Sequence, residues 1–236
     1  MSYRAVYQDI GVRDYKAAWD YQEKVFTRLV SEKISWSNNS DGYDEYTPGT
    51  LIFVEHPHVY TLGKSGSENN LLLDALQLKA KEADFYRTNR GGDITYHGPG
   101  QVVGYPIFDL NRMGLSLREY IHCLEEAIIL TLREFGLKGS RLTGATGVWL
   151  DPEITGRARK ICAIGVKASR YVTMHGFAFN VNTDLSYFGY INPCGFTDKG
   201  VTSMKNELGA AQDIESAKMI IRKNLQNVFD LTWVEY

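Results

Sequence analysis

The clearest periodic pattern in the chain predicts a long central helix. Ser116 and Glu119 form the Ser-x-x-Glu pattern of a capping box, and Gly136 provides a typical C-terminal stop. The apolar residues at helical spacing between them are Leu117, Ile121, Leu124, Ile128 and Leu132. Cys123 lies within this helix, where we interpret it as a small packed thiol of the core.

Three aspartates mark the predicted starts of further helices. Asp14 precedes an amphipathic stretch near the beginning of the chain, and Asp213 precedes another near its end. Asp74 precedes a shorter stretch that also fits a helix.

Apolar runs between these helices predict the strands. They lie at residues 3–10, 50–55, 84–88, 147–150, 160–168 and 175–181, followed by a β-like LTWVEY at the end. Helices and strands mix without a strict alternation, which favours an α+β fold over a doubly wound one. Because no internal repeat or linker-like stretch appears, we expect a single domain over residues 1–236.

Composition is that of an ordinary globular protein. Hydrophobic residues make up 44% of the chain, charged residues 23%, and the formal net charge is -2. This charge argues against non-specific nucleic-acid binding as the main role. The first residues lack the apolar core of a signal peptide, and no apolar run approaches membrane-spanning length, so we expect a cytoplasmic protein.

The cysteines and histidines give no sign of a structural staple. Cys123, Cys162 and Cys194 are too few and too scattered for a disulfide framework. No CxxC pair exists, and the five histidines show no HxxxH or HExxH spacing, which argues against a zinc site. We therefore expect neither a metal nor a cofactor.

The most unusual segment is RGGDITYHGPGQ at residues 90–101. Its four glycines allow a ligand to approach the backbone closely and leave amides available as donors. A tight, solvated turn between strands is the alternative interpretation. A phosphate-binding loop is not supported, because neither GxGxxG nor GxxxxGK[ST] occurs and Pro99 removes an amide that such a loop needs.

A second segment, GRARKICAIGVKASR at residues 156–170, is basic throughout. It carries Arg157, Arg159, Lys160, Lys167 and Arg170 and no acidic residue. On pattern alone, a solvated strand with exposed basic side chains is favoured. A docking surface for an acidic macromolecular partner is the alternative, since complementary charge accelerates association.

The third segment is NPCG at residues 192–195. A cysteine between proline and glycine lies in a turn, so Cys194 fits a core position less well than Cys123 does. A nucleophilic thiol needs accessibility and a neighbouring cation or base that favours its thiolate. His97, His175 and Lys160 are the candidates, and the sequence alone leaves the choice among them open.

Taken together, these segments resemble the lipoyl(octanoyl) transferase family. RGGDITYHGPGQ is similar to the signature of that family. The other matching blocks, in the family order, are HPHVYTLGK at 56–64, TGVW at 146–149, RKICAIGVK at 159–167, MHGFAFNV at 174–181, NPCG at 192–195 and GVTSM at 200–204. The matches run from about residue 56 to 204 and so span most of the chain.

The resemblance implies a mixed β-sheet flanked by helices, similar to the biotin/lipoate protein ligase catalytic domain. It implies that Cys194 is the acyl-thioester nucleophile and that Lys160 favours its thiolate and acts as acid and base. The residues that it implies for the acyl-substrate pocket are Arg90, Gly91, Gly92, Asp93, Ile94, Thr95, Tyr96, His97, Ala163, Ile164, Gly165, Gly176, Phe177 and Ala178. We add the hypothesis that backbone amides of Gly91, Gly92 or Gly176 stabilise an oxyanion.

The resemblance also implies two protein partners and no nucleic acid or membrane. Octanoyl-acyl carrier protein is the implied donor, and lipoyl domains of 2-oxoacid dehydrogenase complexes and the glycine cleavage H protein are the implied acceptors. Because such partners are typically acidic, docking becomes the favoured interpretation of the basic segment at residues 156–170.

Cys162 invites a separate prediction. It lies two residues from Lys160, so a regular strand would point both side chains to the same face. Adventitious acylation of this thiol is then conceivable, but we favour a buried structural role.

Three other functions compete with octanoyl transfer. An ATP-dependent lipoate protein ligase shares the implied fold and acceptor but activates a free acid as an adenylate and needs no cysteine. A cysteine hydrolase would pair Cys194 with His97 or His175 and release free acid without an acceptor. A non-catalytic carrier-binding protein would keep its function in a Cys194→Ala variant.

Overall fold

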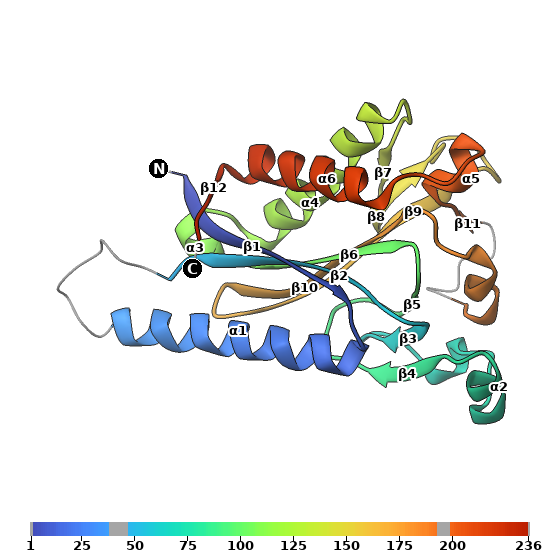
Figure 1. The fold of residues 1–236 in the computed structure, drawn as a ribbon, viewed down its shortest axis with the longest axis horizontal. Helices are drawn as coiled ribbons and strands as arrows, with labels where there is room; N and C mark the ends of the chain where they lie inside the picture. The colour runs from blue at the N-terminus through green and yellow to red at the C-terminus, as the bar shows by residue number, and fades with distance from the viewer. Residues whose placement is uncertain (1, 38–46, 193–198, 236) are drawn as a thin grey trace.

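A computed structural model describes residues 2–37, 47–192 and 199–235, and its largest element is a mixed β-sheet with helices on both faces (Figure 1). The strands of this sheet within the described residues are, in spatial order, β12 (Leu231–Trp233), β1 (Tyr3–Val12), β2 (Gly49–Glu55), β6 (Gln101–Ile107), β10 (Val172–Asn180), β9 (Arg159–Ser169), β8 (Ala145–Leu150) and β7 (Ser140–Leu142), with β11 (Gly200–Val201) beside β9. Strand β1 runs parallel to β2 and β12, and β11 runs parallel to β9. The other neighbours are antiparallel, so the predicted mixed α+β architecture is confirmed.

A second, small sheet was not expected from the sequence. Its strands are β4 (Asp84–Arg87), β3 (Val59–Leu62) and β5 (Ile94–His97), in the order β4-β3-β5. Strand β5 lies inside the glycine-rich segment, which is therefore not simply a loop. Its pairing partner β3 lies more than thirty residues earlier in the chain, and such a non-local pairing leaves no local periodic signal.

The helices flank the main sheet on two sides. Those of more than two turns are α1 (Tyr15–Ser37), α4 (Leu117–Glu134) and α6 (Ile214–Phe229). The short ones are α2 (Ala75–Ala80), α3 (Leu110–Met113), α5 (Met204–Leu208) and the 3-10 turns η1 (Glu68–Asn70) and η2 (Leu185–Tyr190). In Figure 1, α4 and α6 lie above the sheet and α1 lies below it.

The helix boundaries follow the predicted capping residues. Ser116 and Glu119 exchange the two hydrogen bonds of a capping box at the start of α4, and Gly136 adopts φ +75° just beyond its end. Asp213 accepts a hydrogen bond from the Ser216 amide and so caps α6. Asp14 accepts one from the amide of Ala17 at the start of α1. These local predictions are confirmed.

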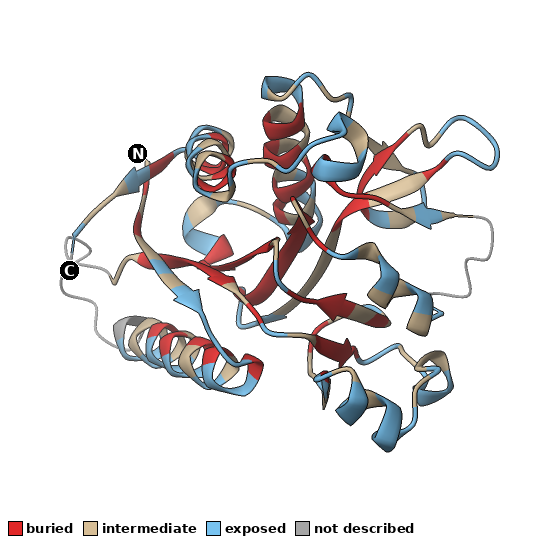
Figure 2. Ribbon diagram, turned by 45° about the vertical axis from the view of Figure 1, so that its right-hand side comes forward, coloured by how far each residue is buried: buried red, intermediate tan, exposed pale blue. Residues whose placement is uncertain are grey.

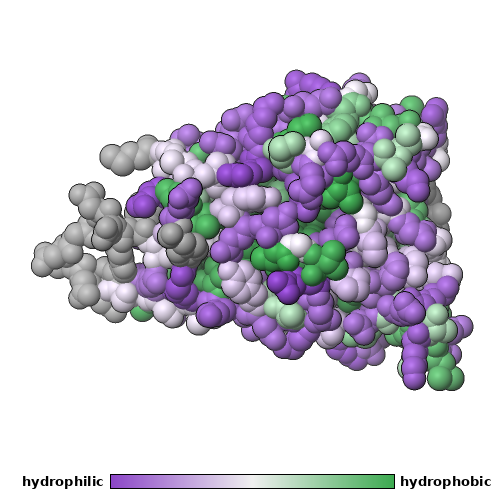
Figure 3. Space-filling view, in the orientation of Figure 1, coloured by the Kyte–Doolittle hydropathy of each residue, from purple (hydrophilic) through white to green (hydrophobic). Residues whose placement is uncertain are grey.

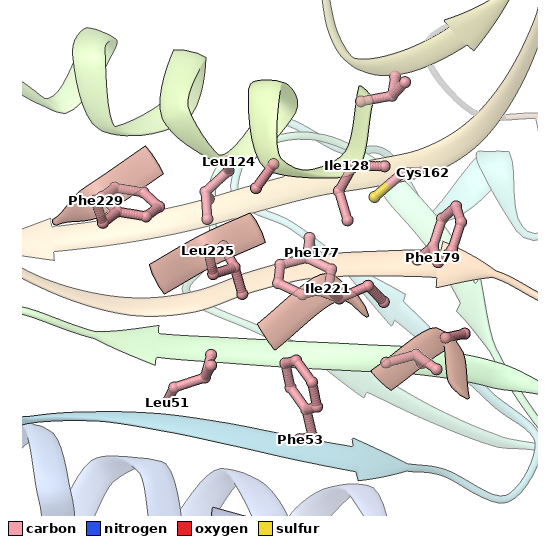
Figure 4. Close-up of a cluster of buried hydrophobic side chains, with 14 of the residues drawn as sticks. Leu51, Phe53, Leu124, Ile128, Cys162, Phe177, Phe179, Ile221, Leu225 and Phe229 are labelled. Carbon is pink, nitrogen blue, oxygen red and sulfur yellow. The ribbon is translucent and has the colours of Figure 1, made fainter. Parts of the chain in front are cut away.

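The central strands are buried on both faces, as Figure 2 shows in red. Along β2, Leu51 and Phe53 face the layer of α4 and α6, whereas Ile52 and Val54 face α1. Two-sided burial explains why this strand is apolar without interruption. Each face therefore has its own hydrophobic core, and Figure 4 shows the larger one beneath α4.

The surface is mainly polar on the face that Figure 3 shows, where hydrophobic side chains form small separate patches. Among the described residues, none of the helices has both the length and the apolar character that crossing a bilayer requires. The interpretation of residues 1–236 as one domain stays a prediction.

Candidate functional site

A cavity of about 540 Å³ lies between the two sheets and extends to strand β11. Its walls come from β5, β6, β8, β9 and β10, and from the glycine-rich segment that precedes β5. The residues predicted for the acyl pocket that line it are Arg90, Gly92, Asp93, Ile94, Thr95, His97, Ala163, Ile164, Gly165, Gly176, Phe177 and Ala178. Lys160 lines the same cavity. Segments from three distant parts of the sequence thus meet around one space.

Two of the predicted pocket residues do not line the cavity. Tyr96 is fully buried among the aromatic residues behind the small sheet, and its hydroxyl lies 2.7 Å from Nδ1 of His58. Strand alternation explains this, because Tyr96 points to the opposite face from Thr95 and His97. Gly91 lies outside the lining, and its N–H donates to the Val166 carbonyl at 2.8 Å. That amide is already used, so the oxyanion hypothesis is wrong for Gly91.

Small residues on β9 and β10 shape the wall of the cavity. Ala163 pairs with Ala178 across the two strands, and Gly165 pairs with Gly176. A Cβ on Gly165 would lie 3.0 Å from the Gly91 carbonyl oxygen. The glycine therefore permits the close backbone approach that brings the Arg90 segment against β9.

Arg90 is a buried guanidinium in this wall. Its side chain is held by Nη2 donating to the carbonyl oxygen of Thr61 at 2.6 Å and by Nη1 donating to the carbonyl oxygen of Gly91 at 3.0 Å. Guanidinium retains its charge even when buried, so Arg90 contributes a fixed positive charge to the site.

Two histidines line the cavity and are held neutral. Burial above all, with His56 and Arg90 nearby, lowers the pKa of His97 to about 3. Burial, Arg90 and Lys167 lower the pKa of His175 to about 3 as well. Both nitrogens of His97 have partners, with Nδ1 2.8 Å from Gln101 Oε1 and Nε2 3.3 Å from Thr61 Oγ1. His97 is therefore not free to deprotonate a thiol.

Lys160 is the second residue of β9, and it pairs with residues of both neighbouring strands, β8 and β11. It pairs with Trp149 on β8, and its Nζ lies 4.6 Å from the centre of the Trp149 ring. On the other side, the Thr202 N–H donates to the Lys160 carbonyl at 2.9 Å. Of the three candidate bases, Lys160 is the one whose side chain lies at the β8 and β11 end of the cavity.

A β-bulge separates Cys162 from Lys160. The register pairs Val148 with Cys162 but Trp149 with Lys160, so β9 carries one extra residue, Ile161, at this point. The extra residue reverses the alternation, and the prediction that Cys162 shares the face of Lys160 is wrong.

The thiol of Cys162 instead lies in the core beneath α4, near Ile128, as Figure 4 shows. It is fully buried, and this burial raises the pKa of the Cys162 thiol well above its ordinary value. The predicted structural role of Cys162 is therefore confirmed. Cys123 packs against the same core and is partly buried.

The basic segment does not form one patch. Strand β9 extends about 3.3 Å per residue, which separates Arg159 from Arg170 by roughly 36 Å. Arg159 is already paired, at 2.6 Å with Glu207 and at 2.7 Å with Asp151. Docking of an acidic partner on this segment stays a prediction, and the largely exposed Arg157 lies 3.9 Å from Asp151.

Several lining residues were not predicted. Trp149, Gln101 and Asn180 occur in the quoted sequence blocks but had no assigned role, and Tyr15 comes from α1. Gln101 and Asn180 are polar residues in apolar, fully buried strands, and this contrast is a signal that sequence reasoning can use. Tyr15 carries no comparable signal, because only the packing of α1 brings it to the cavity.

Cys194 lies outside the described residues. Asn192 and Lys199, the described residues on either side of this gap, both line the cavity.

The sequence matches, over residues 14–226, the family model of the lipoyl protein ligase A/B catalytic domain. A protein named octanoyltransferase from Parabacteroides distasonis is 55% identical over 223 residues, which cover 94% of this chain and 97% of that protein. Another of that name, from Flavobacterium johnsoniae, is 56% identical over 224 residues, covering 94% of this chain and 95% of that protein.

A solved structure supports the fold independently of close sequence similarity. It comes from an archaeal lipoylation system, described as a bi-partite lipoate protein ligase and its E2 lipoyl domain from Thermoplasma acidophilum. It aligns with a TM-score of 0.69 at 13% identity, over 99% of this chain and 87% of that one. The predicted mixed sheet of the lipoate protein ligase type is thereby confirmed. The chain belongs to the lipoyl protein ligase A/B catalytic domain family.

Proposed function

We propose that this chain is an octanoyltransferase, an acyltransferase that carries octanoyl groups from octanoyl-acyl carrier protein to lysines of lipoyl domains. The observation that carries this proposal is the 55% identity, over 94% of the chain, to a protein named octanoyltransferase. At such identity the same chemistry is the expected one, whereas the fold by itself would leave the activity open.

The cavity suits an acyl chain. Ile94, Ile164 and Phe177 offer apolar surface, and the paired Ala163 and Ala178 leave room beside them. A thioester-linked alkyl chain gains free energy when such a surface is removed from water. This supports the assignment to substrate binding of Ala163–Gly165, Gly176–Ala178 and the residues of Arg90–His97 that line the cavity.

In the proposed reaction Cys194 is the nucleophile. Its thiolate attacks the thioester carbonyl of octanoyl-acyl carrier protein, and the carrier leaves as its phosphopantetheine thiol. The lysine amine of the lipoyl domain then attacks the Cys194 thioester, forming the amide and returning the thiol to the enzyme. The first transfer exchanges one thioester for another, and amide formation drives the second.

Lys160 is the proposed acid and base in both transfers. It would accept the proton of the Cys194 thiol, give it to the departing carrier thiol, and later accept one from the attacking amine. Its side chain lines the cavity, as do Asn192 and Lys199, which bracket the segment containing Cys194. The donor and acceptor proteins themselves, and the glycine cleavage H protein among the acceptors, are part of the proposal.

Dependence on ATP separates this proposal from a lipoate protein ligase. The purified chain is mixed with an acceptor lipoyl domain and either octanoyl-acyl carrier protein alone or free octanoate with ATP. The proposal requires octanoylation of the acceptor with the carrier thioester in the absence of ATP. Modification that appears only with free acid and ATP would replace it by the ligase function.

The pocket assignment predicts a change in acyl-chain preference. Replacing Ala163 with leucine adds three carbons to the cavity wall, and we expect transfer of octanoyl groups to fall about tenfold or more. The rate with butanoyl-acyl carrier protein, whose acyl chain is shorter, should fall much less. The variant should therefore have a higher kcat/KM for the butanoyl donor than for the octanoyl donor. Ala168→Leu, on the exposed end of the same strand, is the matched control. An equal loss for both donors would remove Ala163 from the acyl pocket.

A further inference from the structure

Four buried side chains connect Arg90 to Thr202, the residue after strand β11, by an unbroken series of hydrogen bonds. Arg90 Nη2 donates to Thr61 Oγ1 at 3.1 Å, and that oxygen lies 3.3 Å from His97 Nε2. His97 Nδ1 lies 2.8 Å from Gln101 Oε1, and Gln101 Nε2 donates to Asn180 Oδ1 at 2.8 Å. The series extends from one sheet to the other and along the cavity wall.

Asn180 completes the series at Thr202, directly after strand β11. Its Nδ2 donates to the carbonyl oxygen of Thr202 at 3.0 Å, and the Thr202 N–H donates to the Lys160 carbonyl at 2.9 Å. The Thr202 hydroxyl donates to Glu207, which pairs with Arg159. Thr202 therefore binds the backbone of β9 at Lys160 through its amide, and it binds the ion pair of Arg159 and Glu207 through its hydroxyl.

Which atom donates in each of these hydrogen bonds follows from the Thr202 end of the series. At one end the carbonyl of Thr202 can only accept, so the NH₂ group of Asn180 faces it and Oδ1 must accept from Gln101. Gln101 also donates Nε2–H to the Tyr96 carbonyl, so its Oε1 is left to accept from His97 Nδ1–H. At the other end Arg90 can only donate, so Thr61 Oγ1 accepts there and its own proton is available to His97 Nε2.

The Gln101 end therefore requires a proton on His97 Nδ1, and the Thr61 hydroxyl can serve the unprotonated Nε2 of a neutral imidazole. The burial of His97 favours a neutral ring as well. A ring protonated on Nε2 would set the lone pair of Nδ1 against the acceptor Oε1 of Gln101 and break the series at its centre.

We propose that Gln101 and Asn180 are positioning residues for acyl transfer, and that they hold Thr202 and strand β11 against Lys160 through the Nδ1–H form of His97. The expected effect on the rate of octanoyl transfer rests on the proposed function, whereas the expected tautomer of His97 does not. Asn180 and Gln101 are buried at 3% and 1% exposure, so each group that loses its partner stays unsatisfied. The series thus transmits one fixed geometry from the glycine-rich segment to the lysine.

The kinetic test uses Asn180→Asp, which keeps the shape of the side chain but removes the donor to Thr202. We expect kcat for octanoyl transfer to fall roughly 10- to 100-fold, because small displacements of a reacting group are costly. KM for octanoyl-acyl carrier protein should stay within about twofold, as expected when ground-state binding is untouched. Asn182→Asp is the matched control, since Asn182 donates to the Gln212 carbonyl in the same way and does not line the cavity.

The proposal would be overturned if Asn180→Asp lowered kcat no more than Asn182→Asp does at the same decrease in Tm. It would also be overturned if Asn180→Asp changed only KM. If the wild-type chain itself transfers no octanoyl group without ATP, the proposed function fails, and the next measurement still decides the structural part.

The structural test needs no variant to be active. Nitrogen-15 spectra of the histidine side chains in the wild-type protein at neutral pH report which ring nitrogen carries the proton, and His97→Asn assigns the signal. The inferred series requires His97 to be protonated on Nδ1 and unprotonated on Nε2. A signal from the Nε2–H form, or from a doubly protonated ring, contradicts it.

Discussion

Replacing Lys160 with methionine is expected to lower kcat for octanoyl transfer by about 10²- to 10⁴-fold, the range that positioned acid–base groups supply. Methionine preserves most of the aliphatic stem, so contact with the Trp149 ring is kept while the amine is lost. The measurement is the rate of lipoyl-domain octanoylation from octanoyl-acyl carrier protein at saturating donor. Lys160→Arg should be nearly as inactive, because a guanidinium keeps the positive charge but does not exchange protons near neutrality.

Lys167 supplies the matched control for this experiment. It lies on the same strand, and its Nζ is 5.0 Å from the centre of the Phe26 ring, so Lys167→Met removes a comparable amine-to-ring contact. We expect this variant to retain most of the wild-type rate. Similar losses in the two variants would show that general damage to β9, and not the chemistry of Lys160, explains the effect.

A second large effect is expected on stability in mild acid. Burial lowers the pKa of His56 to about 4 and those of His97 and His175 to about 3. In the unfolded chain these histidines take up protons near pH 6.5. Between that pH and the depressed folded values, the unfolded state binds more protons than the folded state, so falling pH favours unfolding.

The free energy of unfolding should therefore decrease as the pH is lowered below about 6.5, by about 1.4 kcal/mol per pH unit for each such histidine once it is well below that value. For three histidines this approaches the whole stability of a typical domain within two pH units. Urea unfolding at a series of pH values between 7.5 and 4.5 measures the slope.

A single variant tests the origin of that slope. His56 does not line the cavity, and its nitrogens lie 2.8 Å from the Arg13 carbonyl oxygen and 2.8 Å from the Tyr105 hydroxyl. His56→Gln should reduce the slope of the unfolding free energy against pH by about 1.4 kcal/mol per pH unit, the contribution of one proton. His122→Gln, on the exposed side of α4, controls for removal of an imidazole elsewhere. A slope that His56→Gln leaves unchanged would assign the acid sensitivity to other groups.

The sequence predicts best those elements whose signals are local. The start and end of α4 follow from Ser116, Glu119 and Gly136, each of which acts within one helical turn. The continuous apolar run of β2 is explained by burial on both faces of the main sheet. For such elements the chain carries the information within a few residues.

Elements that depend on distant partners were missed. Strand β5 forms because Ile94–His97 pairs with β3, and nothing in the neighbouring glycines indicates that pairing. The bulge at Ile161 depends on the register of β9 against β8, and because of it Cys162 lies in the core and does not share the face of Lys160. A count of residues along a strand holds only while the register is unbroken.

The site was predicted from resemblance more than from pattern. The periodic pattern did not predict that Arg90, Lys160 and Gly176 line one cavity, because they lie in three segments that are far apart in the sequence. The roles that we propose for Gln101 and Asn180 rest on their hydrogen-bond partners, which the sequence alone does not give. Cys194 lies outside the described residues, so its role as nucleophile stays a prediction.

The central claim is a thioester on Cys194, and intact-protein mass spectrometry tests it most directly. The wild-type chain and Cys194→Ala are each mixed with octanoyl-acyl carrier protein without ATP, and lipoyl domain is then added. We expect one octanoyl adduct on the wild type, none on Cys194→Ala, and discharge of the adduct when the acceptor is supplied. An adduct that persists on Cys194→Ala, or acceptor modification by that variant at the wild-type rate, would contradict it.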